Sequence, residues 1–181
     1  MRFSFTVILA SLAALASAQN TVEFVNQDST VRTVYFTQQE GLAYIDPVTI
    51  TGLTNCTVTF PSGWIGNWYS VSEGADDVPG MLGEVAWNGW DGITWFDVSA
   101  IVNPNDLDGV KTISPKFSGT PYSGCASYVD GCDNAYYAAD DVQTKATTET
   151  ALVCTLGTPS SSPKPKGRRH ARHFITGHST H

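Results

Sequence analysis

The chain has 181 residues, of which 41% are hydrophobic, and a formal net charge of −7 at pH 7. The acids are concentrated between residues 19 and 157, where four basic side chains stand against all seventeen acidic ones, hence −13. A body with this charge repels phosphate backbones, which excludes nucleic acid as its partner. After residue 18 no apolar run approaches the roughly 20 residues of a membrane-spanning helix, so we expect no membrane insertion.

Residues 1–18 have the features of a secretory signal peptide. A basic residue precedes an apolar run over 3–16, and residues 16–18 have the small-x-small pattern of a cleavage site. We therefore predict a secreted, extracellular protein whose mature chain begins near Gln19. Export also makes Asn55, in the Asn-Cys-Thr sequon, a predicted glycosylation site.

Short runs of alternating or β-branched residues, each closed by Gly, Pro, Asn or Asp, predict the strands. This pattern is typical of an all-β sandwich or barrel. A helical pattern appears only over 136–147, and it is weak. We predict one all-β domain over 19–157. The predicted strands cover 21–25, 31–37, 56–60, 68–71, 83–87, 93–98 and 151–156.

Residues 83–99 form the clearest predicted hairpin, for which two registers are open. A loop centred on 90–91 places Glu84 directly opposite Asp97, with Cβ atoms about 5 Å apart on one face. Such a like-charge pair destabilises the hairpin unless one carboxyl is protonated, hydrated or used. The competing register has a type I′ turn at 88–89, and it separates the two acids.

The four cysteines, an even number in an exported chain, predict two disulfides. Three pairings are possible. We favour a short bridge between Cys125 and Cys132 and a long one between Cys56 and Cys154. No histidine lies between residues 19 and 157, so we expect neither a catalytic thiol nor a histidine-ligated zinc site.

Residues 158–181 differ in composition from the rest of the chain. They are rich in Pro, Ser and basic residues, contain no acid, and hold all four histidines. Such a segment buries too little apolar surface to offset its chain entropy, so we predict a disordered tail. Two interpretations stay open for it, namely trimming after the dibasic pair at 168–169 and attachment to an anionic wall polymer.

Three segments resemble those of thaumatin-like proteins. Residues 61–68 (PSGWIGNW) resemble the family's GWxGRxW segment, 83–85 (GEV) its AEF strand, and 95–104 (WFDVSAIVNP) its DVS segment. Their order and spacing agree over roughly residues 21–105. The short chain with four cysteines is similar to the small thaumatin-like proteins of filamentous fungi, which are secreted and associated with conidial walls. The resemblance implies a β-sandwich with an acidic cleft and a role in cell-wall remodelling during conidial germination.

The resemblance also implies which residues form that cleft. The family's cleft uses an Arg, a Glu and several Asp, and Glu84 and Asp97 match two of these positions. Asn67 stands where the GWxGRxW segment has its arginine. The second aspartate of the DVS segment has no counterpart here, and Asp106 is our candidate to replace it as a ligand-binding residue. Four cysteines imply that the cysteine-rich second domain of plant members is largely absent.

Carboxylates are the groups left for catalysis in a domain without histidine. Glycoside hydrolysis needs two of them flanking a sugar, and we would assign Glu84 as the acid and Asp97 as the nucleophile or base. In the structural alternative, Asp97 accepts backbone hydrogen bonds and Glu84 is a solvated strand residue.

Tryptophan faces can stack on the apolar faces of sugar rings. Trp87 and Trp90 flank a predicted turn, so they are the candidates for an exposed ligand-binding platform. Trp64, Trp68 and Trp95 lie in strand-like contexts and are interpreted as packing residues.

We therefore expect a monomeric, wall-associated thaumatin-like protein that binds β-glucan or a related wall polysaccharide. Little or no hydrolytic turnover, no cofactor and no bound metal are expected. One alternative is a weak endo-β-1,3-glucanase that acts through Glu84 and Asp97. The other is a surface adhesin or antigen that contacts host receptors.

Overall fold

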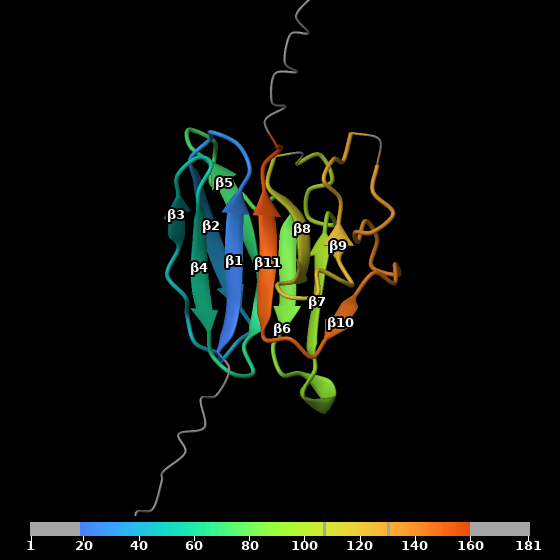
Figure 1. The fold of residues 1–181 in the computed structure, drawn as a ribbon. Helices are drawn as coiled ribbons and strands as arrows, with labels where there is room; N and C mark the ends of the chain where they lie inside the picture. Colours follow the sequence, from blue (N-terminus) through green and yellow to red (C-terminus); the bar gives the residue numbers. More distant parts are fainter. Residues whose placement is uncertain (1–18, 107, 130, 160–181) are drawn as a thin grey trace, which may run out of the picture.

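The structure is a computed structural model that describes residues 19–159 except 107 and 130. Two β-sheets lie face to face, as Figure 1 shows. The predicted signal peptide and nearly all of the predicted tail lie outside the described residues. In strand order, one sheet contains β4 (Asn55–Phe60), β1 (Asn20–Asn26), β11 (Ala151–Leu156), β8 (Val110–Pro115) and β9 (Ser123–Gly124). The other contains β10 (Lys145–Thr147), β7 (Thr94–Ser99), β6 (Leu82–Ala86), β5 (Ile65–Ser72), β2 (Arg32–Gln38) and β3 (Val48–Ile50).

The predicted all-β sandwich is confirmed, and so are its seven predicted strands within a few residues at each end. Sequence analysis missed β3, β8, β9 and β10. The weak helical prediction over 136–147 is wrong, because that stretch is irregular until it joins the sheet edge as β10. Across the described part of the chain, no helix has the length and apolarity needed to cross a membrane.

Alternation along the strands builds an aromatic core between the sheets. Trp68 on β5 packs edge-on against Phe24 of β1, with ring centroids 5.5 Å apart. The ring centroid of Phe60 on β4 lies 5.0 Å from that of Trp64 and 6.0 Å from that of Trp68. Trp64 and Trp68 are fully buried, which confirms their predicted packing role. Gly83 lies opposite Trp68 in the sheet, and its missing side chain leaves the room that the indole occupies.

One of the two predicted disulfides is present. Cys125 and Cys132 are bonded, with Cα atoms 5.9 Å apart. The predicted bond between Cys56 and Cys154 is wrong, and both are free thiols. Each of them pairs with Phe24, Cys56 from β4 and Cys154 from β11. Because β1 lies between their strands, the two cysteines are about 10 Å apart, beyond the reach of a disulfide.

This arrangement predicts the outcome of thiol labelling. Burial raises the pKa of Cys154 to about 12, so its thiol should resist alkylation in the folded protein. In denaturant without reductant, iodoacetamide should add two labels per chain, on Cys56 and Cys154, as read by peptide mass spectrometry. A denatured chain that takes no label would contradict the structure, since all four cysteines would then be bonded.

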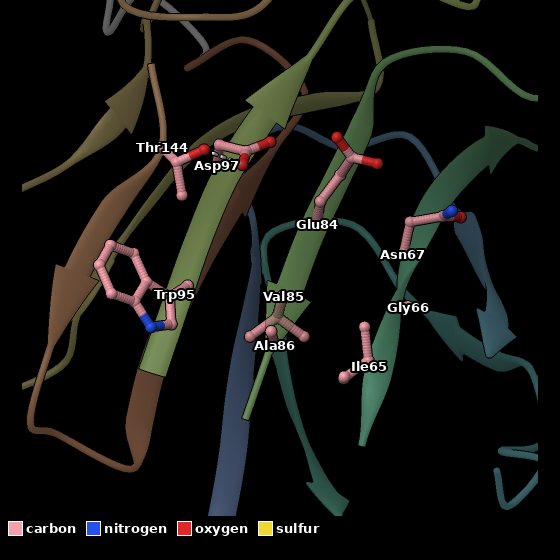
Figure 2. Close-up of a pocket in the computed structure, with 9 residues that line it drawn as sticks. All are labelled: Ile65, Gly66, Asn67, Glu84, Val85, Ala86, Trp95, Asp97 and Thr144. Carbon is pink, nitrogen blue, oxygen red and sulfur yellow. Dashed lines mark hydrogen bonds between the residues drawn. The ribbon is translucent and has the colours of Figure 1, made fainter. Parts of the chain in front are cut away.

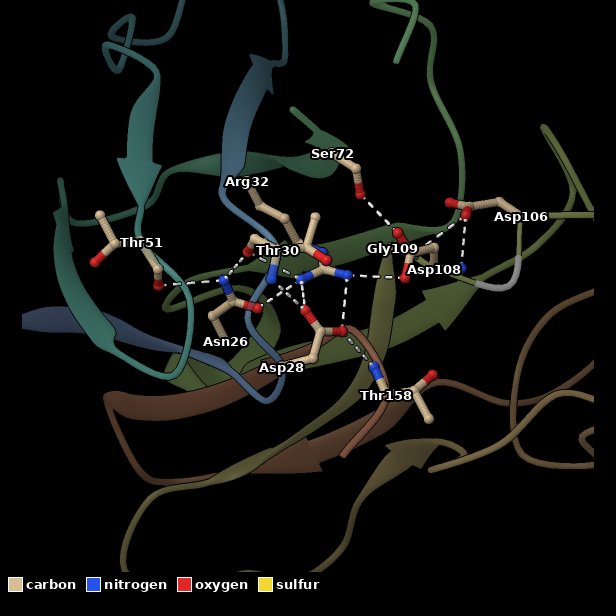
Figure 3. A network of polar contacts seen from close by, with 10 residues as sticks. All are labelled: Asn26, Asp28, Thr30, Arg32, Thr51, Ser72, Asp106, Asp108, Gly109 and Thr158. Carbon is tan, nitrogen blue, oxygen red and sulfur yellow. Dashed lines mark hydrogen bonds and ion pairs between the residues drawn. The ribbon is translucent and has the colours of Figure 1, made fainter. Parts of the chain in front are cut away.

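A buried arginine joins the β1–β2 and β7–β8 loops (Figure 3). Arg32, at the start of β2, is fully buried. Its guanidinium donates to Asp28 at 2.6 and 3.0 Å, to Asn26 Oδ1 at 2.6 Å and to Asp108 at 2.8 Å. Hydrogen bonds from Arg32 hold the pKa of Asp28 well below its usual range. Asp28 also accepts from the backbone N–H of Thr158, so the network ties down the end of the folded chain.

Candidate functional site

The outward face of the six-stranded sheet brings the two predicted acids together. The β6–β7 hairpin has the register that pairs Glu84 with Asp97, and the competing register is absent. Its loop contains a short 3₁₀ turn, η1 (Trp90–Gly92). On the other side of Glu84, β5 contributes Asn67 as its direct partner. Asn67, Glu84 and Asp97 therefore form a row across three strands.

A second row lies next to the first, toward the hairpin loop. It consists of Ile65, Ala86 and Trp95, on the same three strands. Because residues two apart on a strand share a face, this row extends the same surface by about 7 Å. The two rows thus place an apolar strip beside a polar one.

Both rows line an open cleft of about 290 Å³, drawn in Figure 2. In that view the carboxyl groups of Glu84 and Asp97 point to the same region above the sheet. Thr144, which directly precedes β10, forms the remaining wall. The lining residues are Ile65, Gly66, Asn67, Glu84, Val85, Ala86, Trp95, Asp97 and Thr144.

Asp97 is held in an unusual environment for a carboxyl group. It is 8% exposed, and its Oδ2 accepts a hydrogen bond from Thr144 Oγ1 at 3.2 Å. Thr144 in turn lies 2.8 Å from the Tyr136 hydroxyl. Within the described structure, Oδ1 of Asp97 is buried and has no hydrogen-bond partner. A polar atom buried without a partner is uncommon and points to a missing ligand group or a proton.

Electrostatics favour that proton at neutral pH. Burial, the negative charge of Glu84 and, in the protonated state, a hydrogen bond to the Glu84 carboxyl raise the pKa of Asp97 to about 7, against the opposing effects of the Thr144 hydrogen bond and the Lys145 charge. The like-charge conflict expected for this register is thus relieved in part by protonation of Asp97. Asp97, the more buried acid, is therefore the group that stores a proton.

The predicted exposed role of Trp87 is wrong. Its side chain is fully buried and packs 5.8 Å from Phe60. The reason is the alternation along β6: when Glu84 and Ala86 face outward, the next residue must face the core. Trp90, by contrast, is 77% exposed at the hairpin loop, beyond the end of the apolar row.

Asp106 does not line this cleft. Its carboxylate accepts the backbone N–H of Met81 at 2.8 Å, of Asp108 at 3.0 Å and of Gly109 at 3.1 Å. It lines a separate hollow near Ser70 and Ser72. Its contacts thus anchor the β7–β8 connection to the start of β6, which is a structural role.

Sequence reasoning did not assign Trp95, Asn67 or Thr144 to the cleft. Trp95, interpreted as packing, is half-buried and lines the cleft. Its position two residues before Asp97 on a strand was a usable signal. Asn67 was noted only as a replacement for arginine, because its position beside Glu84 depends on the pairing of β5 with β6. Thr144 comes from an irregular segment and has no sequence signal.

The remaining predicted sites lie elsewhere or stay predictions. Asn55 is exposed at the start of β4, in the other sheet, and its side chain bonds to Glu23. Among the residues that the structure describes, no group of three or more His, Cys, Asp or Glu side chains is arranged to hold a metal ion. The cleft is therefore a two-carboxyl site with an aromatic wall.

Comparisons with known proteins identify one relative in sequence and one match in fold. No family model matches the chain. It is 51% identical over 140 residues to the antigenic protein SchS21 of Stachybotrys chartarum, an alignment that covers 77% of this chain and 96% of that protein. The crystal structure of the protein elicitor MoHrip2 from Magnaporthe oryzae matches with a TM-score of 0.59 at 16% identity, over 77% of this chain and 99% of that one. This second likeness shows a shared fold. The identity to the first protein shows that the chain belongs to the family of the fungal antigenic protein SchS21.

Proposed function

We propose that this protein is a secreted, wall-associated thaumatin-like protein that binds β-glucan or a related cell-wall polysaccharide. Its role would lie in wall remodelling during conidial germination. The observation that carries the proposal is the open cleft on the six-stranded sheet, in which Glu84, Asp97 and Asn67 lie beside Trp95.

The chemistry of the cleft supports a sugar ligand. Carboxylate and amide groups offer the hydrogen bonds that hydroxyls need, and the indole of Trp95 offers an apolar face for a pyranose ring. Trp90 is exposed in the hairpin loop, beyond the end of the apolar row, where an extended chain would reach it. The pairing of Glu84 and Asp97 across adjacent strands also supports the thaumatin-like assignment, because these residues match two acids of that family's cleft.

A binding experiment tests the proposal. The domain should sediment with insoluble β-1,3-glucan or chitin, and Trp95→Ala and Trp90→Ala should each weaken binding about five-fold, the effect of losing roughly 1 kcal/mol of aromatic stacking. Phe117→Ala is the matched control, because Phe117 is 81% exposed and does not line the cleft. Wild-type protein that stays wholly in the supernatant would overturn the proposal.

Hydrolysis is a second candidate, favoured by one observation. A buried, proton-bearing Asp97 beside Glu84 resembles the acid and base pair of a glycosidase, although the two roles are then the reverse of those predicted. Release of reducing sugar from laminarin that disappears in Glu84→Gln would establish it. Release that is unchanged by the substitution would remove it.

A surface antigen or adhesin is a third candidate. The name of the 51% identical relative favours it, since that protein is an antigen. Binding to host cells that persists when glycan competitors are added would support this function over polysaccharide binding. Binding that the competitors abolish would favour the cleft.

A further inference from the structure

The cleft has an excess of negative charge that its own residues do not compensate. Glu84 and Asp97 lie side by side, and none of the lining residues is basic. Asn67, on the neighbouring strand, is neutral. Lys145 acts on Asp97 electrostatically. Its register partner on β7 is Phe96, whose side chain is in the core, so the side chain of Lys145 lies on the sheet face opposite to the cleft.

A hydrogen-bond donor is also missing at this place. Asp97 is more than nine-tenths buried, and its Oδ1 has no donor within the described residues. The neighbouring Glu84 carboxyl is a second acceptor, so the two groups can be joined only by a shared proton or by a bound donor. An ionised carboxylate only accepts hydrogen bonds, and an ammonium group carries three donors and a positive charge. One ammonium between the two acids would therefore supply both the missing donor and the missing charge.

From these features we infer that the cleft selects polysaccharides with free amino groups, such as partly deacetylated chitin, and binds one ammonium between Glu84 and Asp97. The inference rests on the proposed function and names its ligand class. In Figure 2 the acids and the indole of Trp95 border one hollow. A glucosamine ring that lies on Trp95, about 7 Å along the strand, turns its amino group toward the carboxyls.

Other ligands fit this site less well. The hydroxyls of a neutral glucan donate hydrogen bonds but leave the charge of the acids uncompensated. A calcium ion takes six to eight oxygen ligands, of which two carboxyls and one amide supply too few. The ammonium is the occupant whose donors and charge match the cleft.

Titration calorimetry of the secreted protein tests this inference with three defined ligands, namely the trimers of glucosamine, N-acetylglucosamine and β-1,3-linked glucose. At pH 6 we expect the glucosamine trimer to bind at least ten-fold more tightly than the other two. Glu84→Gln and Asp97→Asn should each remove this preference.

Charge-matched controls separate the cleft from the general acidity of the domain. Glu40→Gln and Asp46→Asn remove one charge each at exposed positions outside the cleft, and should leave the preference unchanged. An ammonium that displaces the proton of Asp97 should also release protons on binding, as seen from the dependence of the heat on the buffer, and Asp97→Asn should not release them.

Each remaining outcome counts against a defined claim. Equal binding of the three trimers would overturn the inference on amino groups and leave the proposed function standing. A glucosamine preference that falls equally in Glu40→Gln and Glu84→Gln would also overturn it, because attraction would then come from the whole acidic surface. No binding of any trimer, with no sedimentation on wall polysaccharide, would overturn both.

Discussion

Replacement of Arg32 by Met should lower the free energy of unfolding by about 3 kcal/mol, because it removes the buried cation that pairs with the largely buried Asp28 carboxylate. The Arg32 side chain is fully buried and forms ion pairs with Asp28 and Asp108. Without it, the carboxylate of Asp28 and the amide oxygen of Asn26 lose their main donors. Urea unfolding followed by tryptophan fluorescence measures the change.

The pH dependence of this effect has a defined sign. The folded-state pKa of Asp28 is lowered, so its pairing stabilises the fold above the unfolded pKa of about 3.9 and this contribution is lost as the pH falls. The difference between wild type and Arg32→Met should therefore be largest near neutrality and shrink in acid. Lys116→Met is the control, since Lys116 forms a partly exposed ion pair with Glu23 worth at most about 1 kcal/mol. Equal losses in both variants would contradict this account.

The second large effect runs in the opposite direction, because Asp97→Asn should stabilise the protein by about 2–4 kcal/mol at pH 8. The folded-state pKa of Asp97 is about 7, above the unfolded value. Folding is therefore penalised as the pH rises above about 4, and the penalty is complete above pH 7. Asparagine keeps the shape of the side chain and removes its charge.

Thermal unfolding at two pH values checks this prediction. At pH 8 the melting temperature of Asp97→Asn should exceed that of wild type, and at pH 3.5 the two should coincide, because Asp97 is then protonated in both states. Asp46→Asn is the control and should change neither value, since Asp46 is exposed. A variant that is less stable than wild type at pH 8 would show that the carboxylate makes a favourable contact. Stabilisation at the expense of ligand binding is the behaviour expected of a functional group.

Local patterns in the sequence were enough for the fold class and for much of the cleft. Period-two alternation sets which residues of a strand share a face, so Glu84, Ala86, Trp95 and Asp97 follow once the hairpin is recognised. The same rule would have placed Trp87 in the core. The turn residues could not decide the register of the 83–99 hairpin, because the local sequence is compatible with a loop centred on 90–91 and with one centred on 88–89.

Long-range pairing decided the rest. The distance between Cys56 and Cys154 depends on which strand lies between them, and β1 is inserted there by contacts remote in sequence. Asn67 meets Glu84 only because β5 pairs with β6, and Thr144 reaches Asp97 from a segment without a periodic pattern. The sequence by itself therefore determined a β-sandwich with an acidic, aromatic outer face. The tertiary structure decided the order of the strands, the disulfide and the burial of the Asp97 carboxyl beside Glu84, because these features result from contacts between segments that have no common local signal.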